Sequence, residues 1–548
     1  LLSGILLAIS WPPFPLTFLL LFALIPLLIA EQNLIEQKGS TLQYLGLLFT
    51  CIFIWHLIGL QWIFGLGKVS ALGIMIVDTL ILLLFLLPAH FMKKAGKTQL
   101  GQLTFIAAWM SFDLLHLHWE LAFPLLNLGN GLGRFPILIQ WYEFTGVFGG
   151  TFWILLSNLL AYRVYQQYQV DGQLKLRSPK LRNLALVLLV PIVLSTILYF
   201  SYSENDRNLE VVVVHPNIDT RTERYITDQK ELIDRYIQLS KKALTPTTDY
   251  LVWTENAITD GPWIEHIDEM QLLKMVRDSF ADYPQTKIIV GSILYKLYRN
   301  GKPAQLPSGV TYAENLNQAY YTYSAAAQID PGQQNILTRT KQELVPFEES
   351  APYPSLLTWL RNIIGNFTGF TFSAAPKNQD VFYAKNEPHK VTPLICYESA
   401  FGSNTADYVK AGAQVLFVML NEGWYHDWQG ASQFLNFSVV RAVESRRSIA
   451  RSSNDGISAF ISPRGDIIEK QEAFTPDALR QKISINDKIT IYNRFGDYLG
   501  WLALLFGMGA VVYFSSSRFL QPQKKAAPKK GVRPTQTEKG KKKKGKKK

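Results

Sequence analysis

Residues 393–398 read Pro-Leu-Ile-Cys-Tyr-Glu, an apolar run that ends abruptly on a thiol and a carboxylate. Residues 251–257, Leu-Val-Trp-Thr-Glu-Asn-Ala, show the same pattern, in which an apolar run is followed by a carboxylate, here Glu255. Short apolar runs of this kind predict buried strands. Because α/β proteins tend to place their sites at the edge where strands end, the two stretches predict a layered α/β domain with a site at that edge.

Further strand-like runs alternate with helical ones around these two stretches. Residues 222–244 have apolar residues at helical spacing among many charges, which predicts a helix that covers one face of a sheet. The alternation predicts an α/β domain over residues 204–497. The predicted strands are 209–214, 250–253, 287–292, 319–325, 391–396, 414–420 and 456–461.

The chain on either side of this domain is far more apolar. A membrane helix needs about 20 mostly apolar residues, and such runs fill most of residues 1–203 and return once after residue 497. Their recurrence argues against a cleaved signal peptide, and the apolar start without methionine is consistent with a trimmed N-terminus. We predict seven membrane helices before the domain and an eighth after it. The predicted spans are 1–11, 14–30, 42–64, 70–91, 102–119, 147–163, 184–203 and 498–516.

Basic residues predict the orientation of these helices. Loops 92–101 and 162–183 contain three and five Lys or Arg residues, and residues 521–548 contain thirteen against one acidic residue. The tail therefore carries a charge equal to the net +12 of the whole chain. Because basic loops stay in the cytoplasm, the α/β domain is expected to face a periplasm-like space. We interpret residues 517–548 as a solvated cytoplasmic tail rather than a nucleic-acid-binding segment.

Three residues in the α/β domain form a candidate catalytic set: Glu255, Lys341 and Cys396. The only other cysteine, Cys51, lies in a membrane run, so the two thiols cannot meet in a disulfide. A carboxylate in a partly dry pocket can take a thiol proton, and a lysine can stabilise the thiolate and the oxyanion. Each residue alone has an ordinary interpretation, as a core thiol, a solvated lysine or a surface carboxylate. Their shared context favours a site.

The chain resembles the nitrilase superfamily, whose sites combine Glu, Lys and Cys. Within it, the order of parts is similar to the apolipoprotein N-acyltransferase family: about seven membrane helices, a nitrilase-like domain and one last helix. The resemblance covers nearly the whole chain except the lysine-rich tail, and it implies a transmembrane bundle of about eight helices plus an αββα sandwich. The matching runs are residues 341–349 (Lys-Gln-Glu-Leu-Val-Pro-Phe-Glu-Glu), 396–398 (Cys-Tyr-Glu), 421–425 (Asn-Glu-Gly-Trp-Tyr), 441–444 (Arg-Ala-Val-Glu) and 454–456 (Asn-Asp-Gly), with Arg447, Arg451, Phe123-Pro124, Gln140 and Glu143.

The resemblance implies transfer of an acyl chain from a phospholipid to the α-amino group of a lipoprotein's N-terminal diacylglyceryl-cysteine, in a bacterial inner membrane. Cys396 would carry the acyl chain as a thioester in a ping-pong reaction, with Glu255 as the base. Lys341 and a backbone N–H near Tyr397 would hold the oxyanion. Glu349 and Glu398 are expected to orient Lys341 or tune the pocket, and Trp424 and Glu143 to support the site. The scattered histidines predict no metal site, and no cofactor is indicated.

Four residues depart from the family pattern: Thr254 replaces Pro, Glu348 replaces Gly, Glu422 replaces Asp, and His215 replaces Gln. None removes a triad residue, so the departures bear on local loop geometry and substrate preference.

Two apolar segments keep two interpretations each. The glycine-rich loop 120–146 fits either a re-entrant connector or part of a lipid-facing entrance, and Glu143 beside a membrane helix is costly enough to suggest a role. Segment 353–372 fits either a core helix or an interfacial lid that keeps water from the thioester.

Two rival functions deserve comparison with acyl transfer. A membrane-tethered amidohydrolase would use the same triad with water as acceptor, but it has no need of eight helices. A non-catalytic membrane scaffold would have little cause to keep Glu255, Lys341 and Cys396 together. Both comparisons favour the acyltransferase.

Overall fold

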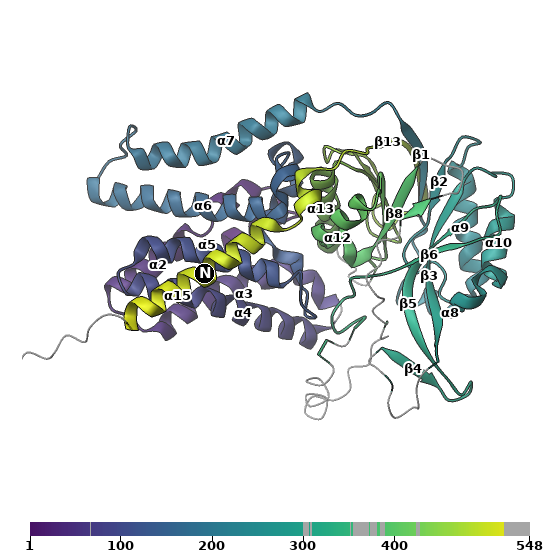
Figure 1. The fold of residues 1–548 in the computed structure, drawn as a ribbon, viewed down its shortest axis with the longest axis horizontal. Coiled ribbons are helices and arrows are strands. Elements are labelled where there is room, and N and C mark those ends of the chain that lie inside the picture. Colours follow the sequence, from purple (N-terminus) through teal and green to yellow (C-terminus); the bar gives the residue numbers. More distant parts are fainter. Residues whose placement is uncertain are drawn as a thin grey trace, which may run out of the picture.

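The computed structural model describes residues 1–65, 67–299, 306, 309–350, 352–353, 372, 381–383, 389–423 and 428–519. Residues 520–548 of the predicted tail and most of segment 353–372 lie outside these ranges. A helical bundle forms one end of the molecule and two β-sheets form the other, with α12 (Gly402–Lys410) and α13 (Trp428–Ser445) between them (Figure 1). The predicted fold class, a membrane bundle plus an α/β sandwich, is confirmed.

Six helical segments of the described chain are long and apolar enough to cross a membrane: Thr17–Glu36, Thr41–Gly59, Lys68–Lys94, Tyr142–Asp171, Pro179–Ser201 and Tyr498–Ser517. The other two predicted spans correspond to α1 (Leu2–Ile9), which is short, and α5 (Thr98–Leu115), whose two glutamines and Asp113 make it less apolar. The bundle helices are α1, α2 (Ile25–Glu36, after the 3-10 turn Thr17–Leu21), α3 (Thr41–Gly59), α4 (Lys68–Lys94), α5, α6 (Tyr142–Asp171), α7 (Pro179–Ser201) and α15 (Tyr498–Phe519).

Burial within the protein differs sharply among these helices. In the apolar window of α6, 72% of the residues are buried inside the protein, whereas only 11% are buried in α7. Helix α6 is therefore central, and the exposed leucines and valines of α7 need a lipid environment to leave water. The chain is a membrane protein on this ground.

The α/β domain contains two stacked sheets. The larger has the order β13-β1-β2-β3-β5-β4, with β6 pairing on β5, and the smaller has the order β12-β11-β10-β9-β8-β7. Strands β1, β2 and β3 run parallel, as do β8, β9 and β10. The strands are β1 Asn208–His215, β2 Tyr250–Val252, β3 Lys287–Tyr298, β4 Val310–Ala313, β5 Gln318–Ile329, β6 Leu337–Thr340, β7 Phe382–Tyr383, β8 Lys390–Ile395, β9 Val415–Leu420, β10 Ser448–Ser453, β11 Ala459–Ile461, β12 Ile467–Lys470 and β13 Asp477–Ser484.

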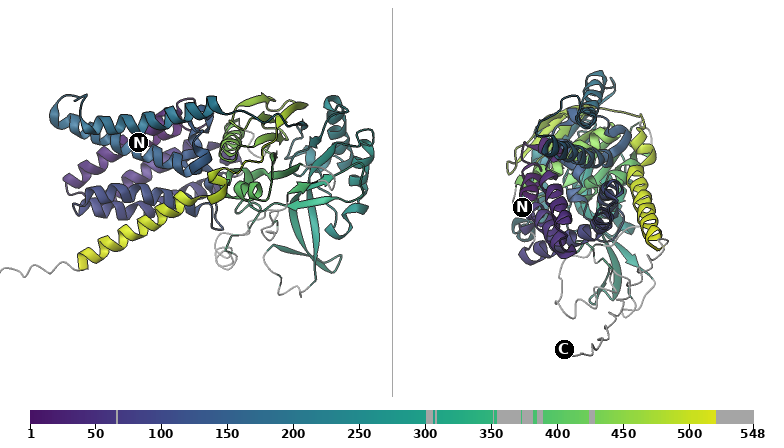
Figure 2. Two further views of the ribbon diagram at one scale, coloured as in Figure 1. Left: turned by 45° about the horizontal axis from the view of Figure 1, so that its top comes forward. Right: turned by 90° about the vertical axis from the view of Figure 1, so that its left-hand side faces the viewer.

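Helices cover both outer faces of this pair of sheets. Helices α9 (Gln229–Ala243) and α10 (Gln271–Ser279) pack on the larger sheet, and α12 and α13 pack on the smaller one, which completes an αββα sandwich (Figures 1 and 2). The core between the sheets contains Val213, Ile289, Phe417 and the nucleophile candidate Cys396. All seven predicted strands are present in the structure.

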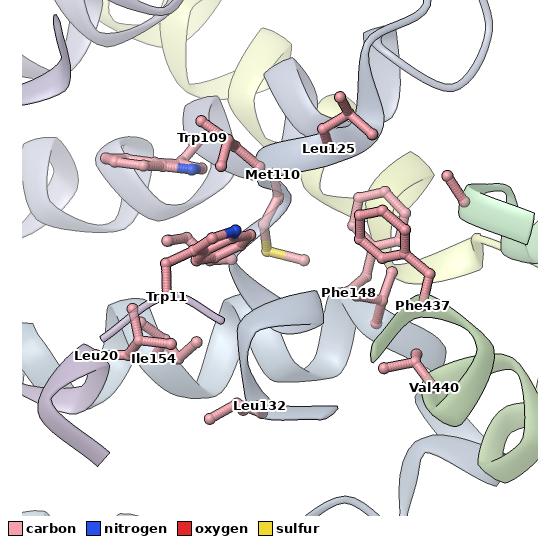
Figure 3. Packing of buried hydrophobic residues seen from close by; sticks show 14 of the residues in the cluster. Trp11, Leu20, Trp109, Met110, Leu125, Leu132, Phe148, Ile154, Phe437 and Val440 are labelled. Carbon is pink, nitrogen blue, oxygen red and sulfur yellow. The ribbon is translucent and has the colours of Figure 1, made fainter. Parts of the chain in front are cut away.

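One hydrophobic core joins the domain to the membrane bundle. It runs from Trp11 and Trp109 of the bundle through Phe148 of α6 to Phe437 and Val440 of α13 (Figure 3). Burying this much apolar surface resists separation of the two parts. The sandwich is therefore fixed against the bundle rather than tethered to it.

The glycine-rich loop 120–146 lies inside this junction. Residues 128–133 are all buried, and a Cβ atom on Gly133 would lie only 2.6 Å from Val440 Cγ2. Gln433 of α13 donates to the carbonyls of Pro12 and Gly59, at 3.0 and 2.7 Å. This burial supports the connector interpretation of the loop, because its glycines allow α13 to approach the bundle closely.

Candidate active site

Cys396 lies on a sharp turn directly after β8. Its φ angle of +50° is in the left-handed region, where a residue with a Cβ is strained by about 1–3 kcal/mol. The Glu398 carboxylate compensates by accepting the backbone N–H of Ile395 at 2.7 Å. The turn therefore directs the thiol out of the strand while a side-chain hydrogen bond holds its backbone.

Lys341 brings two carboxylates together beside this turn. It follows β6, and its Nζ donates to Glu255 Oε1 at 2.9 Å and to Glu349 Oε1 at 2.7 Å. Glu255 follows β2, and the second oxygen of Glu349 accepts the N–H of Val345 at 2.8 Å. Lys341 is only 2% exposed, so these two carboxylates replace the water that would otherwise solvate its ammonium group.

The electrostatics of the cluster keep the thiol protonated at rest. Burial raises the pKa of Cys396 well above its ordinary value, and the Glu255 carboxylate raises it further, while Lys341 opposes both. Burial alone would lower the pKa of Lys341, but Glu255 and Glu349 raise it well above its ordinary value. The resting site thus combines a neutral thiol, a charged lysine and an adjacent carboxylate able to accept the thiol proton.

The structure places all three predicted triad residues in one buried cluster, and it places Glu349 on Lys341 as expected. Glu398, by contrast, does not contact Lys341. Its two oxygens accept from Arg339 Nη2 at 2.8 and 2.9 Å, and it also accepts the N–H of Gln342 at 2.7 Å. Its carboxylate therefore fastens the nucleophile turn to the strand and loop that carry Lys341.

Arg339 is the functional-site residue that the sequence analysis missed. It is 3% exposed, stacks over the ring of Tyr408 at 4.2 Å and also donates to the carbonyl of Pro393. No strand was predicted at residues 337–340, and the partner Glu398 lies 59 residues further along the chain, so no local pattern indicated Arg339.

The other predicted supporting residues have different positions. Tyr397 donates its hydroxyl to the carbonyl of Ala122 at 2.9 Å, which ties the nucleophile turn to the segment after α5. Glu143 pairs with Arg446 at 2.9 Å in the junction, and its support of the site stays a prediction. A buried arginine between α13 and β10 neutralises the cost of this carboxylate. Trp424 lies outside the described residues.

Two models of known families match the chain. Residues 3–160 match the apolipoprotein N-acyltransferase N-terminal domain, and residues 212–487 match the carbon–nitrogen hydrolase family. The chain belongs to the apolipoprotein N-acyltransferase family. This membership makes it an acyltransferase with a carbon–nitrogen hydrolase domain.

Individual relatives cover the chain almost end to end. The apolipoprotein N-acyltransferase of Chlorobaculum tepidum is 24% identical over 535 residues, covering 92% of this chain and 93% of its own. That of Geobacter metallireducens is 27% identical over 515 residues, covering 91% of each. Among solved structures, Nit3 of Saccharomyces cerevisiae, a nitrilase-superfamily member, is 13% identical with a TM-score of 0.36, covering 59% of this chain and 100% of its own.

Proposed function

We propose that the chain transfers an acyl chain from a phospholipid to the α-amino group of an N-terminal diacylglyceryl-cysteine, through a thioester on Cys396. The observation that carries the proposal is the Glu255–Lys341–Glu349 cluster beside a strained cysteine turn, fixed to a membrane bundle. Both substrates are lipid-anchored, so a site held against the membrane can reach them without extracting either one. The names of the relatives support the same activity.

The first half-reaction forms the thioester. Glu255 takes the proton of the Cys396 thiol as Sγ attacks the ester carbonyl of the phospholipid. The oxyanion is held by the Lys341 ammonium and a backbone N–H near Tyr397. The carbon–oxygen ester bond then breaks, Glu255 returns the proton to the departing lysophospholipid oxygen, and the acyl chain remains on Cys396.

The second half-reaction releases the acyl chain as an amide. The acceptor amine attacks the thioester carbonyl, Glu255 takes a proton from the amine nitrogen, and the carbon–sulfur bond breaks. Glu255 then returns that proton to the thiolate, which restores the resting site. Because donor and acceptor react in separate steps, ping-pong kinetics follow.

Glu349 has a distinct part in this cycle. Each time Glu255 is protonated, Lys341 loses one of its two anionic partners. Glu349 remains at 2.7 Å from Nζ and keeps the ammonium charged and in place while the oxyanion develops. We assign Glu349 as a positioning residue.

The proposed location is a bacterial inner membrane, with the sandwich in the periplasm and loops 92–101 and 162–183 in the cytoplasm. The basic residues of those loops support this orientation.

The test is the fate of the acyl chain when full-length protein in detergent micelles receives phospholipid and a diacylglyceryl lipopeptide with a free α-amino group. The expected product is the lipopeptide gaining one acyl chain as an amide, detected by mass spectrometry, with one lysophospholipid formed per transfer. Release of free fatty acid alone, with the lipopeptide unchanged, would show water as the acceptor and favour the tethered hydrolase. The N-acetylated lipopeptide is the matched control, because it has no amine to react.

A further inference from the structure

A polar chamber lies within the helical bundle, lined by residues of α3, α4, α5 and the segment after α5. We call it the Asp78 chamber. Asp78 of α4 stands between two histidines, with His56 Nε2 of α3 at 3.3 Å and His116 Nε2 at 3.0 Å. The space between these groups is enclosed on several sides and leaves room for a group about the size of one water molecule. The chamber is lined by Trp55, His56, Asp78, Trp109, Phe112, Asp113, His116, Phe123, Pro124, Leu126 and Asn127.

In the described structure the partners of Asp78 are two histidines, which carry a charge only when they are protonated. Asp78 and Asp113 are 5% and 4% exposed, and no lysine or arginine is among the residues that line the space. Asp113 receives only a long hydrogen bond, 3.3 Å, from Thr151. Ionisable groups at this depth in a bundle are expensive and are usually paired with a counter-charge. The Asp78 carboxylate therefore favours a cation.

Several buried polar atoms of the chamber lack a hydrogen-bond partner in the described structure. They include Asp78 Oδ1, whose contact with His116 is close without hydrogen-bond geometry, and both ring nitrogens of His116, which is 4% exposed. His56, in contrast, bonds Thr79 Oγ1 through Nδ1 at 2.9 Å. Because buried polar groups are normally satisfied, these atoms point to an occupant that donates N–H groups to Asp78 Oδ1 and to the acceptor nitrogen of His116.

The chamber also borders the nucleophile turn. Its lining residue Phe123 directly follows Ala122, whose carbonyl accepts the hydroxyl of Tyr397, the neighbour of Cys396. Burial, and after it the charges of Glu343 and Asp78, raise the pKa of Tyr397 well above its ordinary value, so Asp78 lies close enough to influence this side chain. The chamber is thus linked to the turn that carries Cys396 through Phe123, Ala122 and Tyr397.

We infer that the Asp78 chamber binds a small primary ammonium group. The Asp78 carboxylate supplies the counter-charge, Asp78 Oδ1 and one ring nitrogen of His116 supply acceptors for N–H donors, and the rings of Trp55, Trp109 and Phe112 favour an organic cation over a hydrated metal ion. The limited room excludes a trimethylammonium group. Resting on the proposed function, the ammonium belongs either to an ethanolamine head group of the donor or to the α-amino group of the acceptor.

Direct binding tests the inference without catalysis. Full-length protein in detergent micelles is titrated with radiolabelled methylammonium, and unlabelled methylammonium, sodium or tetramethylammonium chloride is added as competitor. We expect saturable binding that only methylammonium displaces, and an affinity at least about 10-fold weaker in Asp78→Asn. Asp171→Asn, which removes a carboxylate from the far end of α6, is the control that keeps binding. No saturable binding, or equal displacement by sodium, overturns the inference, and it does so on the wild-type chain even if a variant fails to fold.

A second arm separates the two sources of the ammonium. If the head group binds, thioester formation is faster with phosphatidylethanolamine than with phosphatidylglycerol of the same acyl chains, and Asp78→Asn abolishes the difference. If the acceptor amine binds, Asp78→Asn leaves thioester formation unchanged with both donors and raises the KM for the lipopeptide at least about 10-fold. A folded variant that changes neither overturns the assignment to a substrate. Absence of thioester with every donor would contradict the Cys396 chemistry instead, and the methylammonium titration would still be readable.

Discussion

Two carboxylates that lie 94 residues apart in the sequence, those of Glu255 and Glu349, hold Lys341. Substituting one or the other is expected to have different effects. Glu255 is proposed to exchange protons, so removing it should stop both half-reactions. Glu349 is not proposed to exchange protons, so removing it should weaken only the hold on Lys341. The two residues therefore separate chemistry from positioning.

Glu349→Gln is expected to slow thioester formation about 10- to 100-fold without abolishing it, because one of two anionic partners of the ammonium is lost. Thioester formation is followed by intact-mass spectrometry over a range of pH. The neighbouring Glu348→Gln is the matched control and should retain most of the rate. An unchanged rate in Glu349→Gln, or an equal loss in both variants, would contradict the positioning role.

The buried Asp455 makes the stability of the folded protein depend on pH. Burial, and after it the charge of Glu422, raise the pKa of Asp455 to about 7, above that of an unfolded aspartate. The folded state therefore holds its proton more tightly, and stability is lost as pH rises from about 4 to about 7. Asp455→Asn should remove this loss and stabilise the protein at pH 8 by about 2–4 kcal/mol. Thermal unfolding at pH 5 and 8 measures it, with the exposed Asp206→Asn as control. A variant that is less stable than wild type at pH 8 would refute the prediction.

At the scale of elements, strand ends and the loops after them build the site. The nucleophile turn after β8 and the lysine after β6 are joined by one ion pair, Arg339–Glu398, which is almost fully buried. Removing one partner of such a pair leaves an uncompensated buried charge.

Arg339→Met is expected to destabilise the protein by about 3–5 kcal/mol and to slow thioester formation in the fraction that remains folded. Arg339→Lys should recover part of both losses, since it restores the charge but not the two-oxygen contact. Chemical denaturation and the acylation rate are measured together. Arg207→Met, which breaks the exposed pair with Asp487, should cost less than about 1 kcal/mol. Equal effects at the two arginines would contradict the account.

Apolar strands were predictable at this scale, and polar ones were not. The apolar composition of residues 414–420 predicts a strand there, and β9 spans Val415–Leu420. β10, Ser448–Ser453, contains four serines or arginines that are fully buried, because partners distant in the sequence satisfy them. Arg451, for example, pairs with Glu422 at 2.6 Å. No local pattern encodes such a partner. For the same reason, the pairing of Glu398 with Arg339 and of Glu143 with Arg446 could not be predicted from the sequence.

At the scale of the whole molecule, the junction between bundle and sandwich holds the site at the membrane. The close packing of this junction depends on glycines that let α13 approach the bundle, and on apolar residues that both parts contribute to one core.

Gly133→Ala is expected to loosen this junction, because the added methyl group would lie 2.6 Å from Val440 and 2.8 Å from Asn436. We expect a loss of about 1–3 kcal/mol, seen as a lower Tm. Gly46→Ala in α3 is the control, since nothing lies within 4 Å of its added Cβ atom and a helix favours alanine. A Tm that is unchanged in Gly133→Ala would show that the junction can open without cost.

The central claim is that Cys396 carries the acyl chain. The most direct measurement is intact-mass spectrometry of full-length protein incubated with phospholipid and no acceptor. We predict a gain of one acyl chain that hydroxylamine removes, absent in Cys396→Ala and present in Cys51→Ala, whose thiol lies buried in α3. Folded wild-type protein that gains no mass, or an adduct that persists in Cys396→Ala, would contradict the account.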